Sequence, residues 1–462
     1  MRRVKPRTPP GMRDFTPTEV RQRTWVIERI RTVFERFGYE PVETPTLELF
    51  ETLKGKLGDE GEQLLFKVLR RGTALEDLRL GRVNRVEVTD FDEVVDYALI
   101  YDLTVPFSRF LAMHPTLPMP FKRYQIQRVW RGDKPQRGRY RELYQCDVDV
   151  AGSASMLADA EIIAITVEAL GELGFEEFTT RIGHRKLLDG LVESAGGGEH
   201  FQNICVAIDK LEKIGSDGVR EEMARRGVPA EIATGILKQV TQEGPAPEIL
   251  KRLEAPLAAT RQGPQGIAET RELLAILSAM GVPEQHYRLD LRLVRGLDYY
   301  TGPVFESIVT RPAIGSLTGG GRYDELIGRF TGQPLPATGT TIGLERIIDA
   351  MKEHDLLPAA GSTTDLLVTI FDEATREAAL RLATELRAAG LRTEVLLKPS
   401  RGLKQQIAYA SAKGIPLLAI VGPDELAAGL VTLRAGPRDQ RQVPRDRAAA
   451  EARTFLDALA GS

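Results

Sequence analysis

The sequence predicts a mixed α/β protein with more than one domain, and three observations support this. Strand-rich segments at about 85–150 and 287–309 flank a mainly helical block. Beyond residue 364, buried strands alternate with amphipathic helices, which is typical of a layered α/β domain. A chain of 462 residues is too long for a single hydrophobic core, so two or three domains are expected.

These patterns divide the chain at four positions. Residues 1–183 and 287–356 are expected to form one α+β core, built on an antiparallel sheet and interrupted by a mainly helical insertion at 184–286. Residues 357–363 have the composition of a linker. Residues 364–462 are expected to form a separate α/β domain. Its predicted strands are 366–371, 392–397 and 416–421, and its predicted helices are 373–389 and 403–412.

The first predicted element is a helix that begins at Thr16. Thr16 and Glu19 have the spacing of a capping box, with Pro17 at the first helical position. Apolar residues recur at helical spacing up to Gly38, and a strand is expected from Tyr39 to Pro45. Pattern alone indicates an amphipathic surface helix that packs on its own core.

Composition restricts the classes of function. The net charge of -3 gives no global attraction to nucleic acid, so any RNA contact must come from local basic patches. No apolar run is long enough to span a bilayer, and the basic start of the chain lacks the hydrophobic segment of a secretory signal. Neither Cys146 nor Cys205 lies in a spacing that is typical of metal ligands. This argues against a zinc site and indicates a protein of the reducing cytosol.

Residues 127–149 are the most informative stretch. A β-rich run (124–131), a turn containing Gly132, Pro135 and Gly138, and a second run (140–150) predict a long hairpin. Period-2 geometry lets polar side chains project from its strands, namely Arg131, Gln145, Asp147 and Asp149. Further arginines crowd the turn and its exit, at positions 137, 139 and 141. Such a set suits a substrate with both a phosphate and an amino-acid head group, although charge alone is equally consistent with a solvated hairpin.

Three other segments carry candidate site residues. Residues 101–107 read as an apolar strand with one buried acid, Asp102. Residues 293–306 place Arg295 between a strand and a glycine turn, with Tyr299 and Tyr300 behind it. Residues 339–347 form a glycine-containing turn into a helix that carries Arg346 near its N-terminus. Each segment alone is also consistent with an ordinary structural turn or strand.

Together these segments resemble a known family. The run Arg-Gly-Asp-Lys-Pro-Gln-Arg-Gly-Arg-Tyr-Arg-Glu from Arg131 is similar to motif 2 of class II aminoacyl-tRNA synthetases, in its histidyl-tRNA synthetase form. Residues 293–306 are similar to a segment found in histidyl-tRNA synthetases, 339–347 resemble motif 3, and the first helix and strand resemble motif 1. The motifs occur in the family's order over nearly the whole chain.

The resemblance implies a two-step reaction that joins histidine to its tRNA in the cytoplasm. Arg131 and Arg295 would be catalytic, at the α-phosphate and the amino-acid carboxylate. The implied histidine-binding residues are Asp102, Leu103, Thr104, Arg131, Gln145, Asp149, Arg295, Tyr299 and Tyr300. The implied ATP-binding residues are Arg131, Asp133, Arg139, Arg295 and Arg346, with Mg²⁺ entering beside ATP. The family also implies a homodimer through motif 1 and an anticodon-binding C-terminal domain, with Lys398, Arg401 and Lys404 as candidate tRNA contacts.

Histidine selection has a chemical requirement that two of these residues meet. Neutral imidazole offers one N–H donor and one nitrogen acceptor. The carboxylate of Asp149 can accept from the N–H, and the hydroxyl of Tyr300 can donate to the other nitrogen.

Two alternatives remain open at this point. One is the synthetase-like regulatory subunit of ATP phosphoribosyltransferase, which lacks the C-terminal domain and tends to lose the site arginines. The other is a nucleic-acid-binding module without catalysis. Two departures from the family are also present, since Asp133 stands where many members carry Glu, and the stretch from about Arg70 to Tyr97 is longer than usual.

Overall fold

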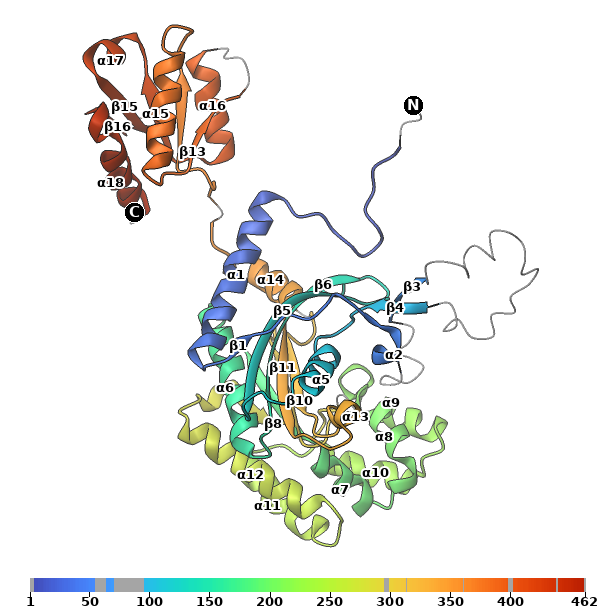
Figure 1. Cartoon of the computed structure of the whole chain (residues 1–462). Coiled ribbons are helices and arrows are strands. Elements are labelled where there is room, and N and C mark those ends of the chain that lie inside the picture. Colours follow the sequence, from blue (N-terminus) through green and yellow to red (C-terminus); the bar gives the residue numbers. More distant parts are fainter. Residues whose placement is uncertain are drawn as a thin grey trace, which may run out of the picture. The chain divides into compact units, whose positions relative to one another are not determined.

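The computed structural model describes residues 4–54, 64–69, 95–294, 299–312, 314–359, 361–397, 402–437 and 439–460 (Figure 1). The chain forms two compact units. The first comprises Met1–Asp14 and Arg23–Leu357, and the second comprises Phe15–Gln22 and Pro358–Ser462. None of the helices in the described ranges is long and apolar enough to cross a membrane.

The first unit is built on a large sheet. Its strands lie in the order β1-β5-β6-β11-β10-β9-β7-β8. The pairs β1–β5 and β7–β8 are parallel, and the other neighbours are antiparallel. The strands are β1 Glu40–Pro41, β5 Phe121–Trp130, β6 Glu142–Ala151, β7 Thr179–His184, β8 Tyr287–Leu289, β9 Pro303–Ile308, β10 Thr318–Arg322 and β11 Ala337–Gly343.

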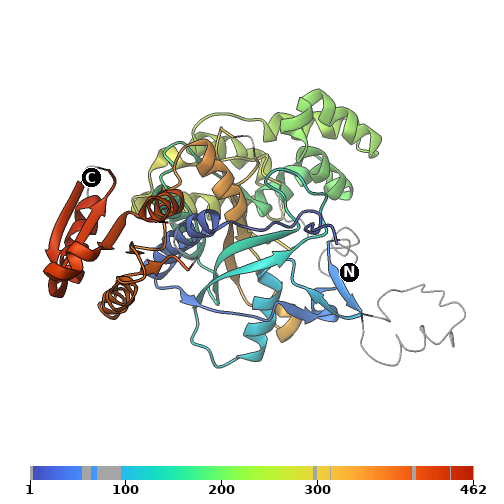
Figure 2. The same cartoon turned by 90° about the horizontal axis from the view of Figure 1, so that it is seen from above.

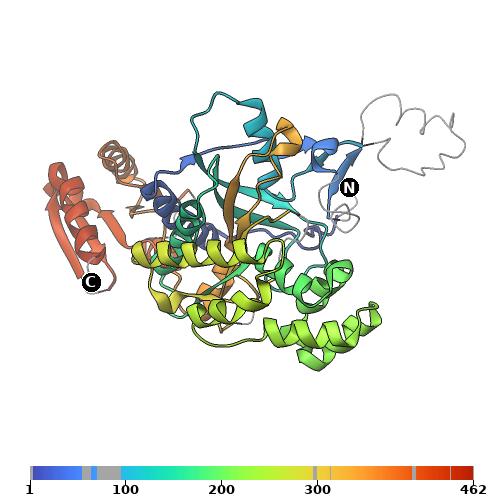
Figure 3. The same ribbon diagram turned by 90° about the horizontal axis from the view of Figure 1, so that it is seen from below.

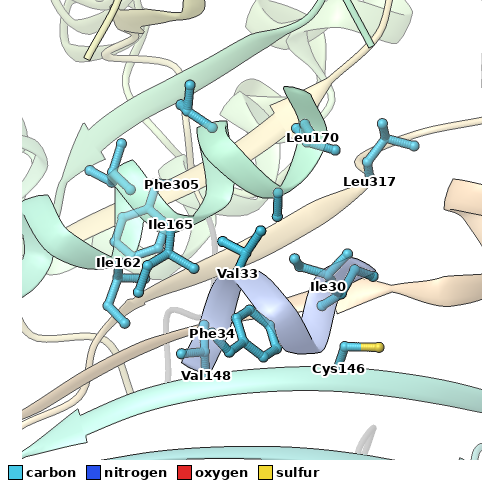
Figure 4. Close-up of a cluster of buried hydrophobic side chains, with 14 of the residues drawn as sticks. Ile30, Val33, Phe34, Cys146, Val148, Ile162, Ile165, Leu170, Phe305 and Leu317 are labelled. Carbon is cyan, nitrogen blue, oxygen red and sulfur yellow. The ribbon is translucent and has the colours of Figure 1, made fainter. Parts of the chain in front are cut away.

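One face of this sheet carries the main core. Alternate residues of β6 are polar and apolar, so Cys146 and Val148 point to the face opposite Gln145, Asp147 and Asp149. Three helices cover the apolar face, namely α1 Pro17–Arg36, α6 Met156–Glu172 and α14 Leu344–Glu353. Figure 4 shows side chains of α1 and α6 packed together with Cys146 and Val148. The polar face lies on the other side of the sheet from these helices.

The first helix has the predicted start. The backbone N–H of Thr16 donates to Glu19 at 2.8 Å, and the N–H of Glu19 donates to the Thr16 hydroxyl at 3.4 Å. This reciprocal pair confirms the capping box. The strand expected at 39–45 is limited to the two residues of β1.

A smaller sheet, in the order β2-β4-β3, lies near the N-terminal end of helix α5. Its strands are β2 Leu47–Leu49, β3 Phe66–Leu69 and β4 Val95–Leu99. The nearby helices are α2 Phe50–Leu53, α5 Thr104–Met113 and α13 Gly328–Thr331. The strand expected at 101–107 is wrong, because α5 begins at Thr104. The carboxylate of Asp102 accepts from the backbone N–H of Val105 at 3.1 Å and so satisfies an N-terminal amide of that helix.

Helices fill the chain between β7 and β8, with their own apolar core. Figures 2 and 3 show them, in green to yellow, gathered on one side of the large sheet. They are α7 Arg185–Ser194, η2 Gly198–His200, α8 Phe201–Ile208, α9 Leu211–Arg225, α10 Ala230–Val240, α11 Ala246–Leu257, α12 Gly263–Ala279 and η3 Glu284–His286. The strand-rich segment predicted from residue 287 was expected to begin with a strand up to Val294, but β8 ends at Leu289.

The second unit is a layered α/β structure with its own core. Its sheet has the order β13-β12-β14-β15-β16. The elements are β12 Leu366–Ile370, α15 Arg376–Ala388, β13 Thr393–Val395, α16 Leu403–Lys413, β14 Leu417–Val421, α17 Pro423–Ala428, β15 Leu430–Ala435, β16 Asp439–Pro444, η4 Arg445–Arg447 and α18 Ala448–Ala460. The predicted elements up to residue 421 are present, with β13 shorter than expected. The antiparallel hairpin β15–β16 extends the sheet beyond them.

Candidate active site

A cavity of about 530 Å³ opens on the polar face of the large sheet. It collects residues from five separate parts of the chain, which are Leu64, the region at the start of α5, the β5–β6 hairpin, the 299–323 region and β11 with the start of α14. The predicted site residues that line it are Asp102, Thr104, Arg131, Asp133, Arg139, Gln145, Asp149, Tyr299, Tyr300 and Arg346. The fold therefore brings these predicted residues to one place.

The strand register explains how the floor of the cavity is made. Three rows of residues cross β5, β6 and β11 on the polar face: Arg123–Asp149–Gly339, Gln125–Asp147–Thr341 and Gln127–Gln145–Gly343. The first row continues to Gly321 on β10. Glycines on the later strands leave the space into which the polar side chains of β6 and the ring of Tyr300 fit.

Arg131 lies just beyond the end of β5 and is fixed by two hydrogen bonds. Its Nε donates to the carbonyl oxygen of Tyr101 at 2.9 Å, and its Nη2 donates to Oε1 of Gln145 at 3.0 Å. These contacts connect the loop before α5 to the hairpin. A guanidinium held in this way presents its remaining donors in a fixed direction, which suits bidentate binding of a carboxylate or phosphate.

The loop before α5 supplies the next group of polar atoms. Asp102 and Thr104 are half-buried and line the cavity. Leu103, which lies between them, does not contribute a side chain to the lining, because its side chain is fully buried with Ile100 and Val129. Its carbonyl oxygen instead accepts from Nη2 of Arg123 at 3.2 Å.

Asp149 lies at the other end of the same cavity wall. One carboxylate oxygen forms an ion pair with Nη2 of Arg123 at 2.8 Å, and the other accepts from the hydroxyl of Tyr323. Burial raises the pKa of Asp149 above its ordinary value, while Arg123 and Tyr323 act to lower it. A Cβ added at Gly339 would lie 2.0 Å from Oδ1 of Asp149, so only glycine leaves room for this carboxylate.

Tyr299 and Tyr300 line the cavity as a pair. Their ring centroids are 4.2 Å apart, and both rings pack on the cluster formed by Phe107, Leu111 and Tyr323. A Cβ added at Gly321 would lie 3.0 Å from the ring of Tyr300. The rings therefore give the cavity an apolar wall at the row of residues that contains Asp149 and Gly321.

Arg346 marks the opposite end of the cavity. Its Nε donates to the carbonyl of Gly138 at 3.1 Å, and its Nη1 donates to the carbonyl of Ser316 at 2.8 Å. Asp133 and Arg139 lie nearby and form an ion pair of 2.7 Å. This end is rich in arginine, whereas the Asp149 end is rich in carboxylate, so the cavity is electrostatically polarised along its length.

Glu345 precedes Arg346 and also lines the cavity. It forms ion pairs with Arg13 and with Arg23, the latter at 2.6 Å. Burial acts to raise the pKa of Glu345, but Arg23 and Arg13 outweigh it and the pKa lies below the ordinary value. These pairs connect the N-terminal segment and α1 to the start of α14.

Three predicted residues lie outside the described part of the chain: Arg295, Lys398 and Arg401. The long stretch 70–94 is also outside it. Lys404 is exposed near the start of α16. Arg137, which crowds the hairpin turn, forms an ion pair with Glu353.

Several residues of the site were not assigned a role by sequence reasoning. Arg123, Tyr323 and Thr341 hold the carboxylates of Asp149 and Asp147 in place. Asp147 was expected to project from the hairpin and lines the cavity, yet no function was attached to it. The signal available in the sequence was strand alternation. Once the two strands of the hairpin are paired, this alternation can place Arg123 and Asp149 on the same face of the sheet.

Comparisons with known proteins show the family of this chain. The family model described as Histidyl-tRNA synthetase matches residues 11–76 and 83–347, and the one described as Anticodon binding domain matches 362–454. Histidine–tRNA ligase of Gloeobacter violaceus is 42% identical over 458 residues, covering 94% of this chain and 95% of the relative. Histidine–tRNA ligase of Aeropyrum pernix is 40% identical over 438 residues, covering 95% of each.

Solved structures give the same result. The crystal structure of histidyl-tRNA synthetase from Nostoc sp. PCC 7120 matches with a TM-score of 0.82 and 30% identity, covering 98% of this chain and 100% of that one. A Bacillus halodurans structure described as an ATP phosphoribosyltransferase regulatory subunit/histidyl-tRNA synthetase matches with a TM-score of 0.71. It is 24% identical, covering 90% of this chain and 100% of that one, and this likeness concerns the fold alone.

Proposed function

The chain belongs to the histidyl-tRNA synthetase family, and from this we infer that it is a histidine–tRNA ligase. It activates L-histidine with ATP to histidyl-adenylate and pyrophosphate, and then transfers the histidyl group to the 3′ end of histidine tRNA. The observation that supports this best is the polarised cavity, with arginines at one end and carboxylates with tyrosines at the other. A site for an amino acid and a nucleoside triphosphate needs carboxylates for the ammonium group at one end. It needs cationic side chains for the phosphates at the other end.

In the first step a carboxylate oxygen of histidine attacks the α-phosphorus of ATP, and the bond to the β-phosphate oxygen breaks to release pyrophosphate. We assign Arg131 to the reacting carboxylate and α-phosphate, because Tyr101 and Gln145 hold its guanidinium in a fixed orientation. Arg295 is proposed for the same role from the family motif. Catalysis would come from positioning and charge stabilisation, without a covalent nucleophile.

The α-ammonium of histidine would lie at the start of α5. Asp102 supplies a carboxylate, Thr104 a hydroxyl and Gln145 an amide oxygen, all lining the same part of the cavity. Charge-assisted hydrogen bonds of this kind contribute about 1.5–3 kcal/mol each. Leu103 would act by orienting the loop, since its side chain is buried.

The imidazole ring would lie between Asp149 and the two tyrosines. An ionised carboxylate has about four lone-pair sites, so Asp149 can accept from the imidazole N–H while Arg123 and Tyr323 remain bound. Tyr300 would donate to the second ring nitrogen, and Tyr299 would form the apolar wall. A pocket that makes both hydrogen bonds rejects amino acids lacking them by factors of about 10⁴–10⁵.

ATP would occupy the arginine-rich end. Arg346 is proposed to contact the outer phosphates, and Asp133 with Arg139 would separate to take the nucleotide. Mg²⁺ would enter as part of MgATP, since this ion usually keeps several waters and binds through phosphates with one or two carboxylates. Among the described residues no group of three or more His, Cys, Asp or Glu side chains is arranged to hold a metal.

The second unit is proposed to bind the anticodon of the tRNA, and motif 1 to form a homodimer interface. A ligase that serves translation would act in the cytoplasm. The regulatory-subunit alternative would not need the C-terminal unit, and the match of residues 362–454 to an anticodon-binding family supports the ligase instead.

ATP–pyrophosphate exchange measured with each amino acid in turn tests the proposal. We expect exchange with L-histidine and background values with the others. Exchange should be lost, by about 10²–10³ in rate, in Arg131→Ala, which removes one preorganised charge contact. Strong exchange with another amino acid, or none with histidine, would contradict the assignment.

A further inference from the structure

Asp147 is the buried acid of the cavity for which the mechanism has no use so far. It lies in the middle of β6, between Gln145 and Asp149, and lines the cavity with only 1% of its surface exposed. Its Oδ1 accepts from the hydroxyl of Thr341 at 2.7 Å and from Nε2 of Gln145 at 3.3 Å. No described residue donates a hydrogen bond to Oδ2 of Asp147.

The other buried carboxylates of the described chain all have a cationic partner. Asp149 pairs with Arg123, Asp159 with Arg322, Glu345 with Arg23, and the remaining pairs are Glu48–Arg109, Glu222–Lys210, Asp290–Arg292 and Glu306–Arg181. Asp147 is the exception among them, because no described Arg, Lys or His forms an ion pair with it. Arg123 acts on it only through longer-range attraction, since its guanidinium is bound to Asp149.

An unpaired buried carboxylate is costly for the fold. Burial raises the pKa of Asp147 to about 7, with the nearby Asp149 adding to the rise and Arg123 and Thr341 opposing it. The Asp147 carboxylate therefore lowers the stability of the fold while it faces a ligand cavity. This combination is typical of a residue that is retained for ligand binding. A cation supplied by the ligand would complete its ion pair.

The row order of the sheet indicates which cation this is. Gln145, on the arginine side of Asp147, is bound to Arg131, where the proposed carboxylate and phosphate chemistry occurs. Asp149, on the other side, lies at the proposed imidazole end. Asp147 therefore lies beside the part of the bound histidine between its carboxylate and its imidazole ring. This part contains the α-carbon, which carries the ammonium group.

We propose that Asp147 is a direct counter-ion of the α-ammonium of the bound amino acid, beside Asp102. Oδ1 stays bound to Thr341 and Gln145, and Oδ2 accepts one of the three ammonium N–H groups. This inference rests on the proposed function, because it takes the orientation of histidine from it.

The test compares Asp147→Asn with wild type in two assays on the full chain. Isothermal titration calorimetry measures binding of L-histidine, of L-histidinol, which keeps the ammonium and lacks the carboxylate, and of imidazolepropionate, which lacks the ammonium. Thermal unfolding of the ligand-free protein measures stability. Glu48→Gln is the matched control, because Glu48 is also buried but is paired with Arg109 outside the cavity.

We expect Asp147→Asn to weaken L-histidine and L-histidinol by about 10- to 100-fold and to leave imidazolepropionate within about twofold. The same variant should raise Tm, because it removes an unpaired buried charge. Glu48→Gln should lower Tm and leave binding of all three ligands unchanged.

Three results would overturn the proposal. Equal weakening of all three ligands would place Asp147 against the imidazole instead. A lower Tm with unchanged histidine binding would make Asp147 a structural residue. A Tm above wild type with no change in any ligand would show that the unpaired charge serves no substrate cation. Failure of the proposed function itself is distinct, since wild type would then show no binding of L-histidine at all.

Discussion

Arg123 and Asp149 lie directly opposite each other on β5 and β6, and their side chains form a 2.8 Å ion pair that is closed off from solvent. The same guanidinium donates to the carbonyl of Leu103, between Asp102 and Thr104. One buried arginine therefore connects the loop that would hold the ammonium to the carboxylate that would read the imidazole. The distance between the two halves of the amino-acid pocket depends on it.

Arg123→Met should weaken both the fold and histidine binding. It leaves Asp149 buried without its cation, and breaking a buried pair in this way costs about 3–5 kcal/mol. Urea unfolding should show that loss, and pyrophosphate exchange should show a KM for histidine that rises more than the KM for ATP. Arg128→Met is the control on the same strand, because the Arg128–Glu142 pair is half-exposed and should contribute only about 0–1 kcal/mol. Similar losses in the two variants would contradict a special role for Arg123.

Gly339→Ala should displace Asp149 while keeping the overall fold. The new methyl carbon would lie 2.0 Å from Oδ1 of Asp149 and 2.7 Å from the carbonyl oxygen of Val148, on the partner strand. Overpacking of this kind costs about 1–3 kcal/mol, and a displaced carboxylate should raise the KM for histidine at least tenfold. Steady-state exchange kinetics measure the second effect.

The control for this change is Gly171→Ala, near the end of α6. A Cβ there meets nothing within 4 Å, so the variant should keep wild-type kinetics and stability or gain slightly from the better helix propensity of alanine. If Gly339→Ala kept the wild-type KM, Asp149 would tolerate displacement and would not read the imidazole.

Local sequence signals predicted the local structure well. The spacing of Thr16 and Glu19 predicted the capping box, and the alternation with Gly132, Pro135 and Gly138 predicted the long hairpin that pairs 121–130 with 142–151. These features depend on hydrogen bonds and turns within a few residues. The segment 101–107 was misread as a strand because its apolar run is too short for periodicity to separate a strand from a helix.

The partners that come from outside the hairpin were beyond sequence reasoning because they lie far away in the chain. Asp149 is held by Arg123 and by Tyr323, which is 174 residues away, and Asp147 is held by Thr341, 194 residues away. Only the pairing of β6 with β5 and β11, and of β11 with β10, brings them together. The missing ion pair of Asp147 likewise appears only when every neighbour is known.

Acid should weaken the junction between the large sheet and the inserted helices. Glu269 on α12 contacts His184 at the end of β7 and Lys186 on α7, at 3.0 and 2.6 Å. Burial acts to raise the pKa of Glu269, but these two partners outweigh it and lower the pKa to about 2. Because the pKa is depressed in the folded state, the stabilisation is complete above the ordinary value of 4.5 and is lost as pH falls toward 2.

Glu269→Gln should remove this pH-dependent contribution. At pH 6 the variant should be less stable by about 1–2 kcal/mol, a modest value because the carboxylate is partly exposed and screened, and the difference should disappear near pH 2. Urea unfolding at a series of pH values measures it, with the exposed Glu272→Gln as control. A constant difference between Glu269→Gln and wild type from pH 6 to pH 2 would show that titration of Glu269 is not the cause.

Lys404 should contribute to tRNA binding without affecting adenylate formation. Its side chain is exposed near the start of α16 in the second unit. If Lys404 contacts a phosphate, Lys404→Ala should weaken tRNA binding several-fold and reduce the slope of log K against log salt by about one. Lys413 lies at the other end of the same helix, but its ammonium is already paired with Glu394, so Lys413→Ala should change the slope little. Filter binding of histidine tRNA over a range of salt concentrations measures both variants, and pyrophosphate exchange should stay at the wild-type rate in each. Equal slopes in the two variants, or a loss of exchange in Lys404→Ala, would remove Lys404 from the tRNA interface.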